Sequence, residues 1–319
     1  MGINVLGYQT TLREKIEFSG VGVHSGQEVS MTLLPAEANS GIIFNVSDNS
    51  NSGESVDLLA NLKMVGATDL CTVLGDPSKA HVATIEHLMA ALRALNVDNV
   101  IVEMDASEVP VMDGSSAVFV DAIKSVGLTS LPATRCYIRV NKPVRVEMGA
   151  SWGEFVPYEG TRFEVEIDFE CEAIGRQKFA ADLTEEVFCR ELSRARTFGF
   201  MKDVERLWAA GFALGSSLEN SVVIGDDNRI INPEGLRYKD EFVRHKTLDA
   251  VGDLALAGAP IIGCFRSYRG GHKLNSIALE ALLSDKNAFD FVQSPMTRPQ
   301  VRHGELVAVS APAYAASFV

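Results

Sequence analysis

Alternating apolar and polar residues occur in two separate stretches of the chain and predict two groups of β-strands. In the first stretch, residues 28–34 alternate, and an apolar segment at 41–46 follows a polar turn. In the second, residues 136–146 and 153–169 alternate in the manner of strands with one solvated face. Two further strands are expected at 100–104 and 261–268.

Segments with helical periodicity lie between these strands. The strongest helix is predicted over residues 240–256, and Pro260 follows soon after its end. A second helix is predicted over 85–95, with Thr84 as its N-cap. The remaining helices are expected at 117–126, 183–192, 201–211 and 276–283.

Residues 87–104 and 246–265 share one layout, in which an amphipathic helix is followed by a short break and a buried strand. Each unit follows a region rich in strands. This likeness predicts an α+β fold of two similar α/β halves, a first domain at 1–132 and a second at 133–319. Chance resemblance is the alternative, because helix–strand units are common. If the halves face each other, each helix places its first turn at a shared cleft.

Composition and charge restrict the class of function. The chain has 319 residues, of which 46% are hydrophobic, and its formal net charge is −13. Such composition is ordinary for a globular protein. An acidic chain is a poor binder of nucleic acid or anionic membranes, because phosphate binding depends on clustered lysine and arginine. A small anionic ligand needs only a local basic pocket and is still compatible with this charge.

The cysteines and the apolar runs of the chain indicate in which cellular compartment the protein resides. Five widely spaced cysteines without a C-x-x-C motif favour a reducing compartment. The N-terminal residues lack the apolar core of a signal peptide, and no run of about 18 apolar residues could cross a membrane. We therefore expect a cytoplasmic protein with no transmembrane segment.

The candidate chemistry lies in histidine and carboxylate spacing. His245 and Asp249 are four residues apart on one predicted helical face, so both can reach one metal ion. His87, at the start of the other helix, could supply a third ligand. Three protein ligands leave a position for water, as in catalytic zinc sites. The alternatives are a salt-bridged helix face and a structural metal site, which usually has four protein ligands.

Two further residues, Glu86 and His272, are candidates for the same site. Consecutive residues on a helix diverge by about 100°, so Glu86 should not bind the metal together with His87. We expect Glu86 beside the metal-bound water, as a general base. His272 follows two glycines in a segment expected to be a flexible loop, where functional residues often occur.

Six short motifs lie in series between residues 10 and 285. In chain order they are GVGVHSG (20–26), TIEHL (84–88), PVMDGS (110–115), SRARTFGF (193–200), DEFVRHKTLD (240–249) and GH (271–272). Their residues and order resemble the bacterial UDP-3-O-acyl-N-acetylglucosamine deacetylases of lipid A biosynthesis, the LpxC family. The resemblance covers about residues 10–285, and the last 30 or so residues lie outside it.

The resemblance implies roles for the candidate catalytic residues. It places metal ligands at His87, His245 and Asp249, and the general base at Glu86. The protonated histidine that assists the tetrahedral intermediate and the leaving amine would be His272, oriented by Asp253. Thr197 would stabilise the oxyanion.

The resemblance also implies substrate contacts and a fold. Lys246 would lie near the diphosphate and Phe198 near the glucosamine ring. Further substrate-binding positions would be Phe200, Leu214 and Gly215. The implied fold has two α/β sandwich halves of ribosomal-protein-like βαβ layout, an insert in each, and the active site in the cleft between them. The second insert, about residues 200–223, would form an apolar passage for the acyl chain. Within this insert, Trp208 and residues 216–218 depart from the sequences of the family. These differences bear on the shape of the passage and on the acyl length, and not on the catalytic chemistry.

The reaction implied is zinc-dependent hydrolysis of the N-acetyl group of UDP-3-O-(3-hydroxyacyl)-N-acetylglucosamine, which gives the free amine and acetate. Fe²⁺ is an alternative to Zn²⁺, because nitrogen and oxygen ligands suit both ions. The family also implies a monomer. A non-catalytic sugar-nucleotide- or acyl-chain-binding protein is the rival from another class, and the joint presence of a base, an acid and metal ligands argues against it. A fused deacetylase–dehydratase would need a longer chain.

Overall fold

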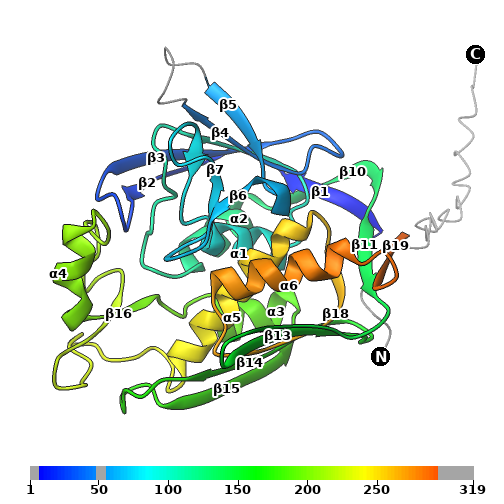
Figure 1. Cartoon of the computed structure of the whole chain (residues 1–319). Helices are drawn as coiled ribbons and strands as arrows, with labels where there is room; N and C mark the ends of the chain where they lie inside the picture. The colour runs from blue at the N-terminus through cyan, green and yellow to red at the C-terminus, as the bar shows by residue number, and fades with distance from the viewer. Residues whose placement is uncertain (1–6, 48–54, 294–319) are drawn as a thin grey trace, which may run out of the picture.

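The computed structural model describes residues 7–47 and 55–293, and it has two main sheets with a layer of helices between them (Figure 1). The first sheet has the order β2-β3-β9-β4-β5. Its strands are β2 (Ile16–Val21), β3 (Glu28–Pro35), β4 (Ile42–Ser47), β5 (Ser55–Leu59) and β9 (Val100–Met104). Only the β4–β9 pair is parallel, and the other pairs are antiparallel.

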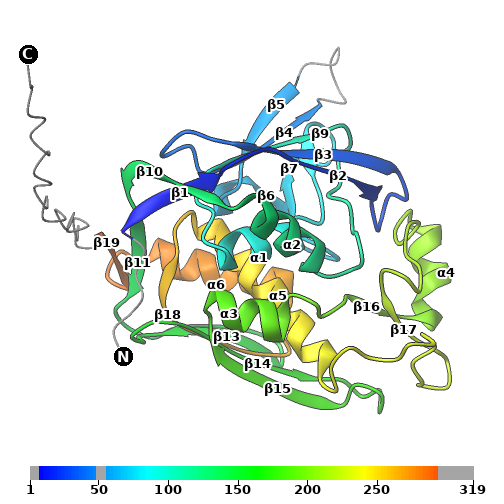
Figure 2. The same cartoon turned by 180° about the vertical axis from the view of Figure 1, so that it is seen from behind.

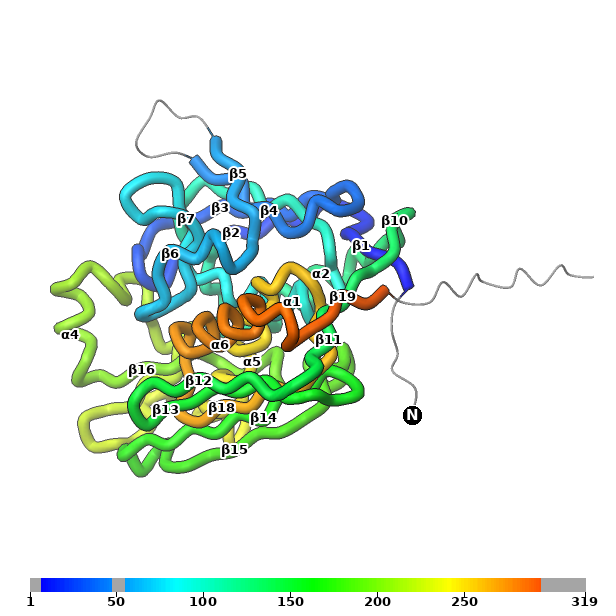
Figure 3. Tube along the Cα trace, turned by 45° about the vertical axis from the view of Figure 1, so that its right-hand side comes forward, coloured from blue at the N-terminus to red at the C-terminus, as the bar shows by residue number. Residues whose placement is uncertain are grey.

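The second sheet has the order β12-β13-β18-β11-β19, and β14 joins it by pairing with β15 and β18. Its strands are β11 (Cys136–Val140), β12 (Val144–Met148), β13 (Ser151–Val156), β14 (Thr161–Asp168), β15 (Arg176–Asp182), β18 (Ile261–Tyr268) and β19 (Phe289–Gln293). Smaller ladders are β1 (Tyr8–Leu12) with β10 (Leu128–Thr134), β6 (Val65–Ala67) with β7 (Val73–Gly75) and β8 (His81–Val82), and β16 (Phe198–Phe200) with β17 (Val222–Ile224). Figure 3 shows β1 and β10 close to β11 and β19 at one end of the molecule.

The helices between the sheets pack against both of them. They are α1 (Glu86–Ala94), α2 (Ala117–Val126), α5 (Glu241–Leu254) and α6 (His272–Ser284). The short α3 (Glu185–Val187) continues into a π-helix (Phe188–Leu192), and 3₁₀ turns occupy Leu62–Met64 and Ala255–Ala257. A single apolar cluster includes Phe44 of the first sheet, Leu88 of α1 and Phe155 of the second sheet. Burying each such side chain contributes roughly 1.5–3 kcal/mol, so both sheets depend on the same helices.

α4 (Met201–Ala209) lies apart from this layer, at the edge of the molecule beside β16 and β17 (Figure 2). No residue of α4 is buried. The connection around it exposes five large apolar side chains, those of Met201, Trp208, Phe212, Leu214 and Leu218. Contiguous exposed apolar groups on a folded chain commonly mark a binding surface.

The predicted elements are largely confirmed, and the differences have local causes. The helix predicted at 276–283 begins earlier, at His272, so this histidine opens α6 rather than lying in a flexible loop. The Gly270-Gly271 pair suggested a loop, but the apolar face already starts at Leu274, which is fully buried. β19 was not predicted, since it is a short edge strand that pairs only with β11.

The predicted N-cap of α1 is also wrong. Ile85 occupies the cap position without a side-chain hydrogen bond, and Thr84 has a φ of 59°. The Thr84 hydroxyl donates instead to the carboxylate of Glu108, 2.9 Å away. Among the residues described, no helix is both long and apolar enough to span a membrane.

α1 and α5 cross in direct backbone contact. A Cβ placed on Gly252 of α5 would lie 2.0 Å from the backbone oxygen of Glu86, the first residue of α1. Eleven of the other residues of α5 and all but Arg93 of α1 are buried. Glycine at 252 therefore sets the distance between the two helices that carry the candidate metal ligands.

We expect Gly252→Ala to reduce the free energy of unfolding by about 1–3 kcal/mol, because backbone atoms must move to admit the methyl group. Gly7→Ala is the control, since a Cβ there would meet no atom within 4 Å. Urea unfolding of both variants measures the difference. Equal stability of the two variants would contradict the close crossing of α1 and α5.

Candidate active site

Five ionisable side chains converge where the first turn of α1, the middle of α5 and the first residue of α6 meet. They are Glu86, His87, His245, Asp249 and His272, and all of them are buried. Removing ionisable groups from water is costly unless they are paired or bind a metal, so such clusters mark functional sites. The structure thus brings together residues from three helices that are far apart in sequence.

The geometry of three of these residues fits a divalent metal ion. Oδ1 of Asp249 lies 3.3 Å from Nε2 of His245 and 3.6 Å from Nε2 of His87. Ligand atoms about 2.1 Å from a tetrahedral ion lie about 3.4 Å apart. The same Asp249 oxygen is buried and has no hydrogen-bond partner within the described structure. An orphaned carboxylate oxygen beside two imidazole nitrogens is a donor set suited to zinc.

His245 is held in the form that a metal requires. Its Nδ1 donates to the backbone oxygen of Ala195 at 3.0 Å, which leaves the lone pair on Nε2, the atom that faces Asp249. Burial lowers the pKa of His245 to about 3, against the opposing effect of Asp249. The imidazole is therefore neutral near pH 7.

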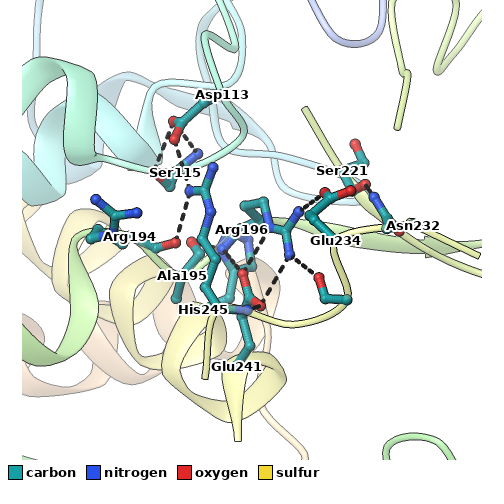
Figure 4. Close-up of polar contacts among 12 residues, drawn as sticks. Asp113, Ser115, Arg194, Ala195, Arg196, Ser221, Asn232, Glu234, Glu241 and His245 are labelled. Atoms are coloured by element: carbon teal, nitrogen blue, oxygen red, sulfur yellow. Dashed lines mark hydrogen bonds and ion pairs between the residues drawn. The ribbon is translucent and has the colours of Figure 1, made fainter. Parts of the chain in front are cut away.

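A buried ion pair fixes the Ala195 carbonyl that orients His245 (Figure 4). The backbone N–H and Nε of Arg196 both donate to Oε1 of Glu241, each at 3.0 Å. Arg196 and Glu241 are 1% and 0% exposed. Because Glu241 opens α5 and His245 lies one turn later, this pair holds the 193–197 loop against the helix that bears two candidate ligands.

Hydrogen bonds from Glu241 continue through Arg237 to residues 110–115, the PVMDGS segment. Oε2 of Glu241 accepts the backbone N–H of Arg237 at 2.6 Å, and Nη1 of Arg237 donates to Asp113 at 2.8 Å. The backbone oxygen of Gly114 accepts the N–H of Thr197 at 2.8 Å. The backbone oxygen of the half-buried Thr197 in turn accepts the N–H of Val222 at 2.8 Å, so Gly114 and β17 together fix its position.

On the other side of the cluster, His272 is the cationic member. Its Nδ1 lies 3.0 Å from Oδ2 of Asp253, and its Nε2 lies 3.7 Å from Glu86 and 3.9 Å from Asp249. Burial acts to lower its pKa, but the carboxylates of Asp253, Glu86 and Asp249 outweigh this and raise the pKa to about 9. His272 and His245 therefore differ in charge near neutral pH.

Two residues that the sequence did not single out complete this arrangement. Thr72 donates its hydroxyl to Oδ1 of Asp253 at 2.6 Å and its backbone N–H to Oε2 of Glu86 at 3.1 Å. Asn275 donates to Oδ2 of Asp253 at 2.8 Å. Asn275 lies one helical turn after His272 and follows from spacing once α6 begins at His272. Nothing in the local sequence marks Thr72. Burial raises the pKa of Glu86, although His272 opposes that shift.

The candidate substrate-binding residues occupy the rim. Nζ of Lys246 lies 2.7 Å from Oδ2 of Asp249 and 5.7 Å from the centre of the Phe198 ring. The Phe198 ring packs edge-on against His245, with centroids 6.2 Å apart. Phe200 lies two residues further on, next to α4, and is half-buried.

Leu214 and Gly215 follow α4 in the chain and contact His24 and Val23. Their backbone N–H groups donate to His24 and Val23, each at 3.1 Å. Leu214 is 52% exposed, so its side chain is available to a ligand. Lys246 and Phe198 thus contact Asp249 and His245, whereas Leu214 and Gly215 contact residues 22–26.

Comparisons with known proteins agree with one another. A family profile described as LpxC, UDP-3-O-acyl N-acetylglycosamine deacetylase, matches residues 9–284. Proteins of Brucella ovis, Brucella abortus and Brucella melitensis, each named UDP-3-O-acyl-N-acetylglucosamine deacetylase, are 62% identical over 287 residues. The alignment covers 90% of this chain and 99% of each relative.

We expect Glu241→Ala to lower the free energy of unfolding by about 3–5 kcal/mol, because Arg196 then keeps only the exposed carboxylate of Glu234 and the backbone N–H groups of Arg196 and Arg237 lose their acceptor. Glu147→Ala is a matched control, since Glu147 pairs with Arg145 on the surface, where ion pairs contribute about 0–1 kcal/mol. Urea unfolding compares the two. Similar losses would mean that the Arg196–Glu241 pair does not hold the loop.

Proposed function

The chain belongs to the LpxC family of UDP-3-O-acyl-N-acetylglucosamine deacetylases, and we propose that its buried histidine–carboxylate cluster is the site of deacetylation. The enzyme acts in lipid A biosynthesis and removes the acetyl group of UDP-3-O-acyl-N-acetylglucosamine as acetate. The proposal adds that the reaction is a zinc-dependent hydrolysis of the 3-hydroxyacyl substrate and assigns the residues that perform it.

One observation carries the metal assignment, the orphaned Oδ1 of Asp249 between two imidazole nitrogens. His87, His245 and Asp249 would hold the ion, with Zn²⁺ preferred and Fe²⁺ compatible. When bound, such an ion supplies Lewis acidity and lowers the pKa of water. The neutral state of His245 and the carbonyl of Ala195 behind it favour this role.

Glu86 is the proposed general base. Burial raises the pKa of its carboxyl and so makes the carboxylate a stronger base. The backbone N–H of Thr72 fixes Oε2, so that Oε1 remains on the side of His272. In this position Glu86 takes the proton of the water that attacks the acetamide carbonyl.

His272 is the proposed acid and electrostatic partner. Its Nδ1–H is directed to Asp253, so the proton on Nε2 points to the space shared with Glu86 and Asp249. Positive charge there stabilises the tetrahedral oxyanion, together with the Thr197 hydroxyl. The proton on Nε2 then passes to the departing amine nitrogen, which could not leave as an amide anion.

The substrate is an acylated UDP-sugar, and its parts match the chemistry of the rim. Lys246 offers a cation for the diphosphate, and the Phe198 ring beside it offers a face to the sugar. The acyl chain would lie along the 200–223 segment, whose Phe200, Leu214 and Gly215 line the passage in this proposal. The exposed apolar side chains around α4 support it.

We further propose that the chain is organised as two halves, 1–132 and 133–319, with the site in the cleft between them. The five strands of the first sheet all precede residue 105, and those of the second all follow residue 135. A monomer in the reducing cytoplasm is the proposed state, and the five cysteines, none of which is paired, support that location.

We expect acetate release from UDP-3-O-acyl-N-acetylglucosamine to disappear on metal stripping and to return with zinc. Glu86→Ala should lower kcat by about 10²–10⁴-fold with zinc still bound, since general-base catalysis is lost. Glu280→Ala, on the exposed face of α6, is the control. Ligand binding without activity in every metal form would instead support a non-catalytic binding protein.

Zinc content tests the ligand set independently of turnover. Asp249→Ala should reduce zinc in equilibrium dialysis from about one ion per chain to near none, because it removes a ligand of a three-residue site. Asp253→Asn should retain the ion, because Asp253 contacts His272 and not the ligand atoms. Undiminished zinc in Asp249→Ala would rule out this ligand set.

A further inference from the structure

Glu108 is a buried carboxylate outside the cluster described above, and it joins two segments of the site. It is 2% exposed. Its Oε1 accepts the backbone N–H of His24 at 2.9 Å and the hydroxyl of Thr84 at 2.9 Å, while its Oε2 accepts the backbone N–H of Ser25 at 2.8 Å. No ion pair involves Glu108 within residues 7–47 and 55–293. Three neutral donors therefore stabilise this carboxylate.

One of these contacts fixes the start of α1. Thr84 precedes the base Glu86 by two residues and adopts a φ of 59°, which is unfavourable for a β-branched residue. The α1 helix has no side-chain N-cap, and the bond from Thr84 to the buried Glu108 is a side-chain contact that holds this turn. The backbone bonds from Ala83 to Ser107 and from Val109 to Ala83 reinforce it.

The other two contacts hold the loop at residues 22–26 from one side. The opposite side of that loop faces the acyl-binding segment, since His24 and Val23 accept the N–H groups of Leu214 and Gly215. The approach is close, because a Cβ on Gly215 would lie 2.2 Å from the backbone oxygen of Gly22. The loop is therefore confined between Glu108 and the segment that follows α4.

Side-chain packing extends the same connection. The His24 ring meets Phe212 edge-on, with centroids 5.6 Å apart. Phe212 and Leu214 are among the exposed apolar side chains assigned above to the acyl chain. A continuous path of contacts thus runs from the acyl segment through the 22–26 loop and Glu108 to Thr84 and the start of α1.

We propose that Glu108 is a positioning residue that couples the acyl-binding segment to the general base Glu86. This inference rests on the proposed function. An acyl chain bound against Phe212 and Leu214 holds the 22–26 loop in one position. The loop in turn holds Glu108, and Glu108 holds the turn at Thr84 that precedes Glu86. Binding energy from a remote part of the substrate then raises kcat as well as affinity.

Glu108→Gln separates the two contacts. In either orientation of the amide, its NH₂ group faces one of the two loop N–H groups, so one loop donor loses its acceptor while the Thr84 hydroxyl can still be paired. We expect kcat for a long-chain substrate to fall about tenfold or more, the effect of one unsatisfied buried donor. With a 3-O-acetyl substrate, kcat should change little, because that substrate does not reach the segment.

The measurement is kcat and KM, determined separately for both substrates with zinc-loaded wild type and variant. A selective loss of kcat on the long chain supports coupling. An equal loss on both substrates, or no loss on either, would overturn it. A wild type that releases no acetate would instead refute the proposed function, so the two failures are distinguishable.

Thr84 provides a second pair of variants in case Glu108→Gln fails to fold. Thr84→Val removes the hydroxyl and should reduce kcat on both substrates, since the turn before Glu86 is then released directly. Thr84→Ser keeps the hydroxyl and should restore kcat to near the wild-type value. A Thr84→Ser enzyme as impaired as Thr84→Val would contradict a role for the bond to Glu108.

Discussion

The close crossing of α1 and α5 is the constraint on which the site depends. Gly252 lets the two backbones touch at Glu86, and this contact brings His87 within 3.6 Å of Asp249. Apolar side chains from both sheets pack around the same helices, so the core that stabilises the fold also desolvates the cluster. That desolvation is unfavourable for folding and favourable for chemistry, because electrostatic interactions are stronger when water is excluded. Hydrogen bonds around Asp253 and Glu241 offset part of its cost, and an ion held at Asp249, as proposed, would offset more.

Within this desolvated site, neighbours decide what each histidine does. His245 donates to a neutral carbonyl and is kept neutral by burial, with a pKa of about 3. His272 donates to a carboxylate and lies near two more, and its pKa rises to about 9. In the proposed mechanism, one residue type therefore supplies both a metal ligand and a proton donor, on opposite oxygens of Asp249. This division of roles between like groups is a general way to run acid and base chemistry at one pH.

Spacing and periodicity predicted most elements and the core of the candidate site, because both are local properties of the chain. His245 and Asp249 follow from an i, i+4 pattern, and His87 from the repeated helix–break–strand layout. The partners that orient them do not follow from sequence in this way. Thr72 meets Asp253 across 181 residues, and Glu108 meets His24 across 84. Thr84 was misread as an N-cap because its hydroxyl is used by Glu108, a choice that only the tertiary structure determines.

α4 differs from α1 and α5 in how it is held in the structure, because α1 and α5 are almost entirely buried. No residue of α4 is buried, and the contacts of the segment around it with the rest of the molecule include two close backbone approaches, Gly215 against Gly22 and Gly114 against Asn220. A helix without buried residues has little local stability of its own. The position of this segment relative to Glu86 must therefore be imposed from outside. The carboxylate of Glu108 meets that need, because it is buried and accepts the backbone N–H groups of His24 and Ser25, while the carbonyls of the same loop accept those of the segment.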